Sequence, residues 1–144
     1  MLRILTEKTL EYSLFLAWMV SAVATAGSLY FSEVLQYIPC ELCWYQRIFM
    51  YPLVILLGRA VIKNDYTIVR YTLILSVVGG SISLYHYLIQ KVTAFASKSI
   101  SCGIIPCTGE YINWFGFITI PFLALIAFLM ISLLSLVIIK KNKE

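Results

Sequence analysis

Charged residues are scarce in this chain of 144 residues: Asp, Glu, Lys and Arg make up 12% of it, whereas hydrophobic residues make up 61%. A water-soluble domain normally carries about twice that share of charge. Together with a mean hydropathy of +0.90, this scarcity excludes an ordinary soluble domain and indicates a membrane protein. The formal net charge is only +4, and we expect no nucleic-acid partner.

The hydrophobic residues fall into four runs, each long enough to cross a bilayer as a helix. About 20 residues are needed, because a helix rises about 1.5 Å per residue and the hydrocarbon core is about 30 Å thick. The expected spans are residues 12–31, 44–62, 71–89 and 114–139. Little sequence remains for a soluble core, so we predict one all-α domain over residues 1–144, a four-transmembrane-helix bundle.

The first run has some features of a signal peptide, since basic residues precede it and Ala24-Thr25-Ala26 resembles a cleavage site. The apolar run continues beyond Ala26 to Phe31, and three more spans follow. We therefore expect an uncleaved membrane anchor.

The positions of Lys and Arg predict the orientation of the bundle. With both termini in the cytoplasm, the cytoplasmic side holds Arg3, Lys8, Lys63, Arg70, Lys140, Lys141 and Lys143, and the outer side holds Lys91 and Lys98. This distribution follows the positive-inside rule. We expect a multi-pass membrane protein, with the loops at about residues 32–43 and 90–113 outside.

Cysteine is also rare: the chain has four, in two close pairs, Cys40 with Cys43 and Cys102 with Cys107. Both pairs lie in the loops expected outside, where thiols are not kept reduced and disulfides persist. Topology and cysteine usage thus agree, and they favour two redox-active pairs on the outer side.

The first pair lies where the second span begins, so Cys43 is expected in the first helical turn. Unpaired backbone N–H groups and the helix dipole favour an anion there. Arg47 lies four residues later, on the same helix face. Both features favour a thiolate at Cys43 that could react with an apolar electron acceptor dissolved in the membrane, such as a quinone.

Other interpretations of the cysteines remain open. The first pair could be a structural disulfide, or half of a zinc site completed by the second pair, although thiolates rarely survive in an oxidising compartment. Gly103 and Pro106 are turn-forming residues that allow Cys102 and Cys107 to approach each other. The loop that carries them is long enough for the second pair to reach the first.

His86 is the only histidine. It lies near the outer end of the third span, at the expected depth of Arg47. A lone histidine at a helix end is often only an interfacial polar residue, but this depth makes His86 a candidate for binding the acceptor.

The motif Cys40-Glu41-Leu42-Cys43-Trp44-Tyr45-Gln46-Arg47, followed by Tyr85-His86-Tyr87 and the Cys102 to Cys107 loop, resembles the DsbB family of disulfide-generating membrane proteins. Within the family, the chain is most similar to the short BdbC type of Gram-positive bacteria. The resemblance covers essentially the whole chain.

The resemblance implies a quinone-dependent dithiol oxidase of the bacterial cytoplasmic membrane, multi-pass and with its active site facing outside. Menaquinone or ubiquinone would be its cofactor. Its partner would be an extracytoplasmic thioredoxin-like dithiol protein of the DsbA or BdbD kind, in a lipid membrane. The partner's thiolate would attack Cys102, Cys107 would attack Cys40, and Cys43 would be the thiolate that faces the quinone. Arg47 matches the family's quinone-site arginine, and His86 matches by its position in the third span. All four cysteines would be catalytic, and no metal is expected.

Two alternatives differ in what they predict. A vitamin-K-epoxide-reductase-like enzyme also has four spans, but its quinone-side Cys-x-x-Cys pair comes late in the chain, whereas here it comes early. A structural or metal-binding tetraspan protein would use its disulfides only to hold its loops together.

The short spacing of Cys102 and Cys107 departs from the longer family members and leaves the order of disulfide exchange open.

Overall fold

The computed structural model describes residues 2–92 and 115–143, and the long regular elements there are four α-helices. They are α1 (Leu2–Glu33), α2 (Glu41–Lys63), α3 (Val69–Lys91) and α5 (Ile120–Lys141). Each is long and apolar enough to cross a membrane. The predicted four-helix membrane bundle is therefore confirmed.

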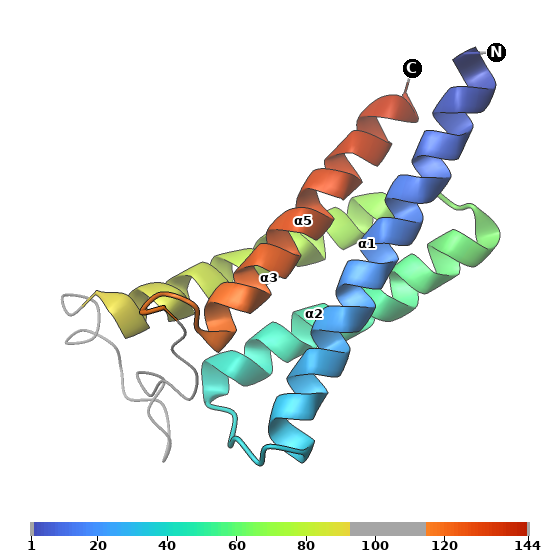
Figure 1. The fold of residues 1–144 in the computed structure, drawn as a ribbon. Coiled ribbons are helices and arrows are strands. Elements are labelled where there is room, and N and C mark those ends of the chain that lie inside the picture. The colour runs from blue at the N-terminus through green and yellow to red at the C-terminus, as the bar shows by residue number, and fades with distance from the viewer. Residues whose placement is uncertain (1, 93–114, 144) are drawn as a thin grey trace.

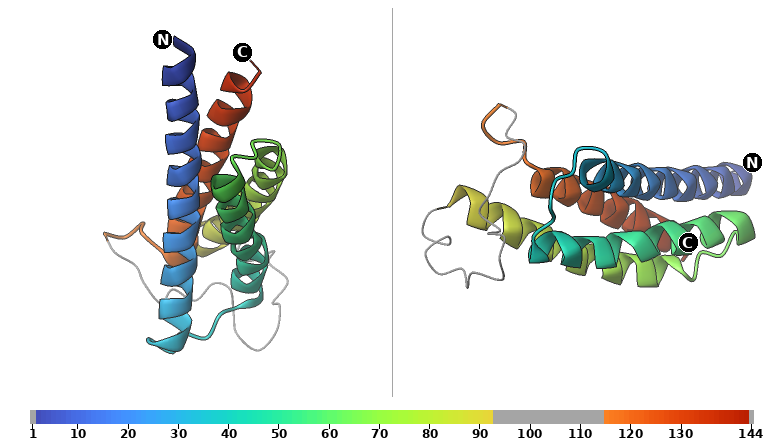
Figure 2. Two further views of the ribbon diagram at one scale, coloured as in Figure 1. Left: turned by 90° about the vertical axis from the view of Figure 1, so that its right-hand side faces the viewer. Right: turned by 90° about the horizontal axis from the view of Figure 1, so that it is seen from below.

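The helices are arranged in a ring, with α1 against α2 and α5, and α3 against α2 and α5. Successive helices run in opposite directions, so the two chain ends lie together at one end of the bundle (Figure 1). The start of α2 and the end of α3 lie at the opposite end. Two further views show α1 beside α5 and α2 beside α3 (Figure 2).

Helix α1 begins well before the predicted span at residue 12. Its 32 residues extend about 48 Å, more than the roughly 30 Å hydrocarbon core. Its first turns carry Arg3, Glu7, Lys8 and Glu11, which are compatible with a helix in water. Hydropathy thus marked where the apolar part of this helix begins, whereas the helix itself begins ten residues earlier, at Leu2.

Helix α5 begins at Ile120, later than the expected start at residue 114, and residues 115–117 form a turn. Pro121 occupies the first turn of α5. Proline has no N–H to donate and disfavours a helical conformation in the residue before it, so it suits the start of a helix and opposes its interior. The aromatic residues before Pro121 made the apolar run longer than the helix.

The interior of the bundle combines apolar and small polar side chains. Leu14, Leu53, Leu57, Phe128 and Ile131 are almost completely buried, whereas large apolar residues elsewhere on the helices are exposed, as expected for surfaces that face lipid. Between α3 and α5, the hydroxyl oxygens of Ser76 and Ser132 lie 2.8 Å apart and share a hydrogen bond. Small and hydroxyl residues are typical of helix contacts in membranes.

A close contact between α3 and α5 lies at Gly79. A Cβ atom added there would lie 2.5 Å from Cε1 and Cζ of Phe128, a ring that is fully buried. A Cβ atom at this position would therefore force the ring to shift. The approach of α3 to α5 therefore requires glycine at this position.

We predict that Gly79→Ala destabilises the bundle by about 1–3 kcal/mol, the usual cost of overpacking a core. Gly27→Ala is the matched control, because an added Cβ there meets nothing within 4 Å and alanine favours a helix. Thermal unfolding of the two variants in the same detergent should show a lower midpoint for Gly79→Ala only. Equal midpoints would contradict the close contact.

Candidate functional site

The first cysteine pair lies at the N-terminus of α2. Cys40 is the N-cap residue, with an extended backbone (φ −74°, ψ 172°), and its carbonyl accepts a hydrogen bond from the backbone N–H of Trp44 at 3.2 Å. Because the helix begins at Glu41, Cys43 lies in the first turn. Backbone N–H groups that lack a helical partner and the positive end of the dipole are found there.

Both cysteines of this pair are in the thiol form. Their sulfur atoms lie 3.5 Å apart, with the Cys40 thiol donating to Cys43 Sγ. Cys40 is buried, with 7% of its surface exposed, and Cys43 is half-buried. The two sulfurs are therefore close enough to form a disulfide after a small movement, but they differ in environment.

This difference affects their acidity. The hydrogen bond to Cys43 and, after it, burial raise the pKa of Cys40 from the ordinary 9.0 to about 11, while the contact with His86 opposes the change. Cys40 thus holds the proton of the pair, and its thiol points at Cys43. The sulfur that receives this hydrogen bond is the one at the positive end of the helix, so negative charge on the pair is favoured at Cys43.

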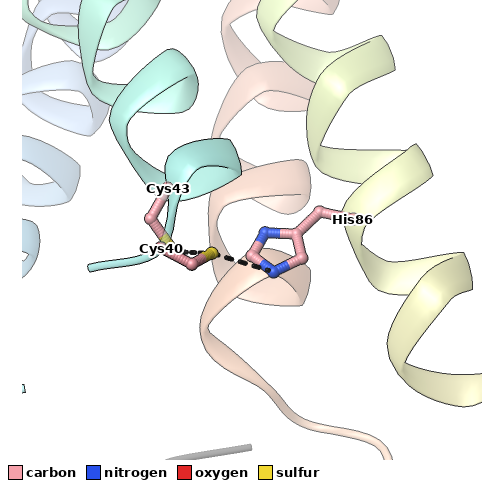
Figure 3. Close-up of side chains that lie close together, drawn as sticks. All are labelled: Cys40, Cys43 and His86. Carbon is pink, nitrogen blue, oxygen red and sulfur yellow. Dashed lines mark hydrogen bonds between the residues drawn. The ribbon is translucent and has the colours of Figure 1, made fainter. Parts of the chain in front are cut away.

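His86 reaches from α3 toward the cysteine pair (Figure 3). Its Nε2 lies 3.7 Å from Cys40 Sγ, and its Nδ1 lies 2.9 Å from Nε2 of Gln46. With the amide donating to Nδ1, Nε2 carries the ring proton and directs it at the Cys40 sulfur. His86 is 1% exposed and Gln46 6%, so this hydrogen bond is shielded from water.

Arg47 follows Gln46 but points toward α1. Its Nη2 donates to the backbone carbonyl of Ser28 at 3.3 Å, and its guanidinium lies 5.4 Å from the centre of the Trp44 ring. The side chain is half-buried. Arg47 therefore links α2 to α1 and keeps a positive charge near the end of the bundle.

A cavity of about 570 Å³ lies between α1, α2 and α5. Its polar lining includes Cys43, Gln46, Arg47 and Ser28, whereas most of its wall is apolar. Volumes of 300–1,000 Å³ with an apolar wall and a few polar groups are typical of small-molecule sites. The cavity thus brings an apolar space into contact with one cysteine of the pair.

The structure brings some of the predicted site residues together. The ligand-type atoms of Cys40, Cys43 and His86 all lie within 4.8 Å of one another, and Arg47 shares the cavity wall with Cys43. Among the described residues that line the cavity, His86 does not occur; its contacts are with Cys40 and Gln46. Cys102 and Cys107 lie outside the described residues.

Sequence reasoning missed Gln46, although a signal for it exists. The buried residues of α2 follow a helical spacing, and Gln46 is the only polar member of that set: Gln46, Met50, Leu53, Leu57 and Ala60. A polar residue on a buried stripe must find a hydrogen-bond partner. The partner here is His86, which comes from another helix and cannot be identified from the spacing alone.

The chain is similar to known proteins along most of its length. The family model "Disulfide bond formation protein DsbB" matches residues 11–138. The chain is 61% identical over 136 residues to the "Probable disulfide formation protein C 1" of Bacillus anthracis. The aligned residues cover 94% of this chain and 98% of the relative. The chain is 55% identical over 118 residues to the "Disulfide bond formation protein C" of Bacillus subtilis, covering 82% and 86%. No solved structure matches the chain significantly.

The two sulfurs of the first pair should differ in reactivity. The test uses a Cys102→Ser/Cys107→Ser variant at pH 9.0, which equals the ordinary pKa of a thiol. At this pH Cys40 remains mostly protonated, because its pKa is raised to about 11. Alkylating agents attack the thiolate, so iodoacetamide should modify Cys43 well before Cys40. Peptide mass spectrometry after timed quenching would measure both rates. In the denatured chain the rates should converge; equal rates in the folded protein would contradict the assignment.

Proposed function

Because the chain belongs to the DsbB family of disulfide bond formation proteins, we propose that it reoxidises an extracytoplasmic thioredoxin-like dithiol protein and passes the electrons to a membrane quinone. The observation that carries this proposal is the Cys40–Cys43 dithiol, whose Cys43 lines an apolar cavity that also contains Arg47. The coarser part, a multi-pass membrane protein of disulfide formation, follows from the family and the four helices.

The cavity fits a quinone in three respects. Its volume of about 570 Å³ lies within the range of small-molecule sites. Its wall is formed largely by apolar residues of α1 and α5, such as Val23 and Leu123, which suit a ring and an isoprenoid tail. Arg47 supplies hydrogen-bond donors, since a guanidinium carries five N–H groups and the Ser28 carbonyl accepts from one nitrogen.

When bound, a quinone would accept the two electrons and two protons that the pair loses as the Cys40–Cys43 disulfide forms. The remaining roles belong to side chains of the protein. The first helical turn and Arg47 favour negative charge on the Cys43 sulfur, next to the cavity. The Nε2–H of His86, directed at Cys40 Sγ at 3.7 Å, lowers the cost of ionising Cys40 when its proton leaves.

The relay from the partner would use the second pair. In the proposed order, the partner's thiolate attacks Cys102, and Cys107 then attacks Cys40 of the oxidised first pair. Attack at Cys40 releases Cys43, the sulfur at the positive end of α2. A thiol that ionises easily is the better leaving group, so the asymmetry of the first pair favours this direction of exchange. Menaquinone and ubiquinone are the candidate acceptors.

The proposed location is the bacterial cytoplasmic membrane, with the cysteine end of the bundle outside. Both chain ends lie at the opposite end of the bundle (Figure 1), and that end carries the Lys and Arg residues that the positive-inside rule assigns to the cytoplasm. An oxidising outer compartment would then contain the dithiol partner.

The direct test is quinone reduction by the purified protein, supplied with a reduced thioredoxin-like dithiol protein. We expect turnover with the wild type and none with Cys43→Ser or Cys102→Ser, because each removes one end of the relay. Quinone absorbance follows the reaction. If the wild type fails with every partner tried while its disulfides stay intact, a structural role for the cysteines is the better explanation.

The cavity itself can be tested at Gly27, which lines it and has open space where a Cβ would be. Gly27→Leu should fill part of the cavity and raise the KM for quinone by roughly tenfold, equivalent to about 1.4 kcal/mol. The control is Gly27→Ala, which adds only one methyl group. An unchanged KM in Gly27→Leu, with the variant folded, would show that quinone does not occupy this cavity.

A further inference from the structure

The cluster of Cys40, Cys43 and His86 has a second chemical capacity besides disulfide formation. Two thiols and an imidazole are the ligands that zinc and similar thiophilic divalent cations prefer. They come from two helices, α2 and α3, and their ligand-type atoms lie within 4.8 Å of one another. The three side chains point toward one another in the reduced form (Figure 3).

Two of the three ligand separations are close to those of tetrahedral coordination. With Zn–S of about 2.3 Å and Zn–N of about 2.0–2.1 Å, tetrahedral geometry places two sulfurs about 3.8 Å apart and a sulfur and a nitrogen about 3.6 Å apart. Here the two sulfurs are 3.5 Å apart, and Cys40 Sγ is 3.7 Å from His86 Nε2. The third separation, between Cys43 Sγ and the imidazole, is within 4.8 Å, so Cys43 and His86 would have to approach each other to hold a cation.

Gln46 provides the outer support that such a site requires. A histidine that binds a metal through one nitrogen usually donates its other N–H to a fixed acceptor. The Gln46 amide lies 2.9 Å from His86 Nδ1. Rotation of this amide by half a turn places its oxygen there, so that Nδ1–H donates to it and the Nε2 lone pair faces the sulfurs.

We propose that the reduced Cys40–Cys43 pair and His86 form a three-ligand site for a divalent cation of the zinc class, with the fourth position open toward the cavity that Cys43 lines. Binding replaces the two thiol protons: the cation joins two thiolates and the imidazole, two protons are released, and no electrons move. A disulfide leaves no thiolates to bind, so the site exists only in the reduced pair. The bound cation in turn prevents disulfide formation.

The test uses the full chain with Cys102→Ser/Cys107→Ser, so that the first pair holds the only cysteines. After anaerobic reduction and removal of the reductant, the protein in detergent is titrated with Co²⁺ and then with Zn²⁺. We expect one equivalent of Co²⁺ to give the intense ligand-field and sulfur charge-transfer bands of a tetrahedral thiolate site, and Zn²⁺ to remove them. Prior oxidation of the pair should abolish binding.

Variants separate the ligands from their support. Cys40→Ser and Cys43→Ser should lose the thiolate bands of the two-sulfur site, and His86→Ala should weaken Zn²⁺ binding more than Gln46→Ala does. For Gln46→Ala we expect a 10–100-fold loss, the usual effect of an outer-shell partner. Ser83→Ala is the control, because Ser83 is a buried polar residue of α3 outside the cluster. The Zn²⁺ affinity of this variant should be unchanged.

A weak octahedral cobalt spectrum, or equal affinity in the parent, Cys40→Ser and His86→Ala proteins, would overturn the inference. If His86→Ala loses its helical circular dichroism, the result for Cys43→Ser decides whether the cluster binds the cation. Cys43 is only half-buried, so its replacement should leave the fold intact. The inference does not rest on the proposed oxidase reaction. Failure of the Cys102→Ser/Cys107→Ser protein to bind metal, with quinone reduction intact in the wild type, would remove this inference alone. Metal binding by that protein, with no quinone reduction by the wild type, would remove the proposed function alone.

Discussion

The buried hydrogen bond between Gln46 and His86 is the interaction on which the geometry of the site depends. It joins two neighbouring helices, and both residues are shielded from water. An unsatisfied polar group in such an environment costs about 1–3 kcal/mol, so each residue constrains the other. The bond fixes the plane of the imidazole, and with it the nitrogen that faces Cys40. The chemistry at the first cysteine is thereby coupled to the packing of α2 against α3.

The two cysteines of the pair differ because the end of one helix gives them different surroundings. Cys40 precedes α2 and points inward to His86, and its raised pKa reflects its hydrogen bond to Cys43 and its burial. Cys43 lies in the first turn, at the cavity. A spacing of two residues thus separates a sulfur that holds the proton from one suited to negative charge. The same closeness that permits disulfide formation also brings three metal-type ligands together, so the two states of the pair are mutually exclusive.

Much of this arrangement could be predicted from the sequence, and the failures have physical causes. The number of helices followed from hydropathy, and the position of Cys43 followed from the start of the second apolar run. The first span was expected from residue 12, and α1 extends ten residues further toward the N-terminus because charged residues can be helical outside the membrane. The fourth span was expected from residue 114, whereas α5 begins at Ile120, because Pro121 favours the start of a helix and the apolar run extends before it. The contact of Arg47 with the Ser28 carbonyl depends on tertiary packing that no local pattern encodes.

The depth of His86 is set by contacts farther along α3. Ser76, Gly79, Ser83 and His86 are all buried, and their spacing of three or four residues places them on one face of the helix. Ser76 bonds to Ser132 of α5, and Gly79 admits the ring of Phe128. Because α3 is a continuous helix, these contacts fix its height and rotation against α5, and His86 follows rigidly. The small residues in the middle of α3 thus position an imidazole near the end of the helix. A displacement of α3 would separate His86 Nε2 from the Cys40 sulfur.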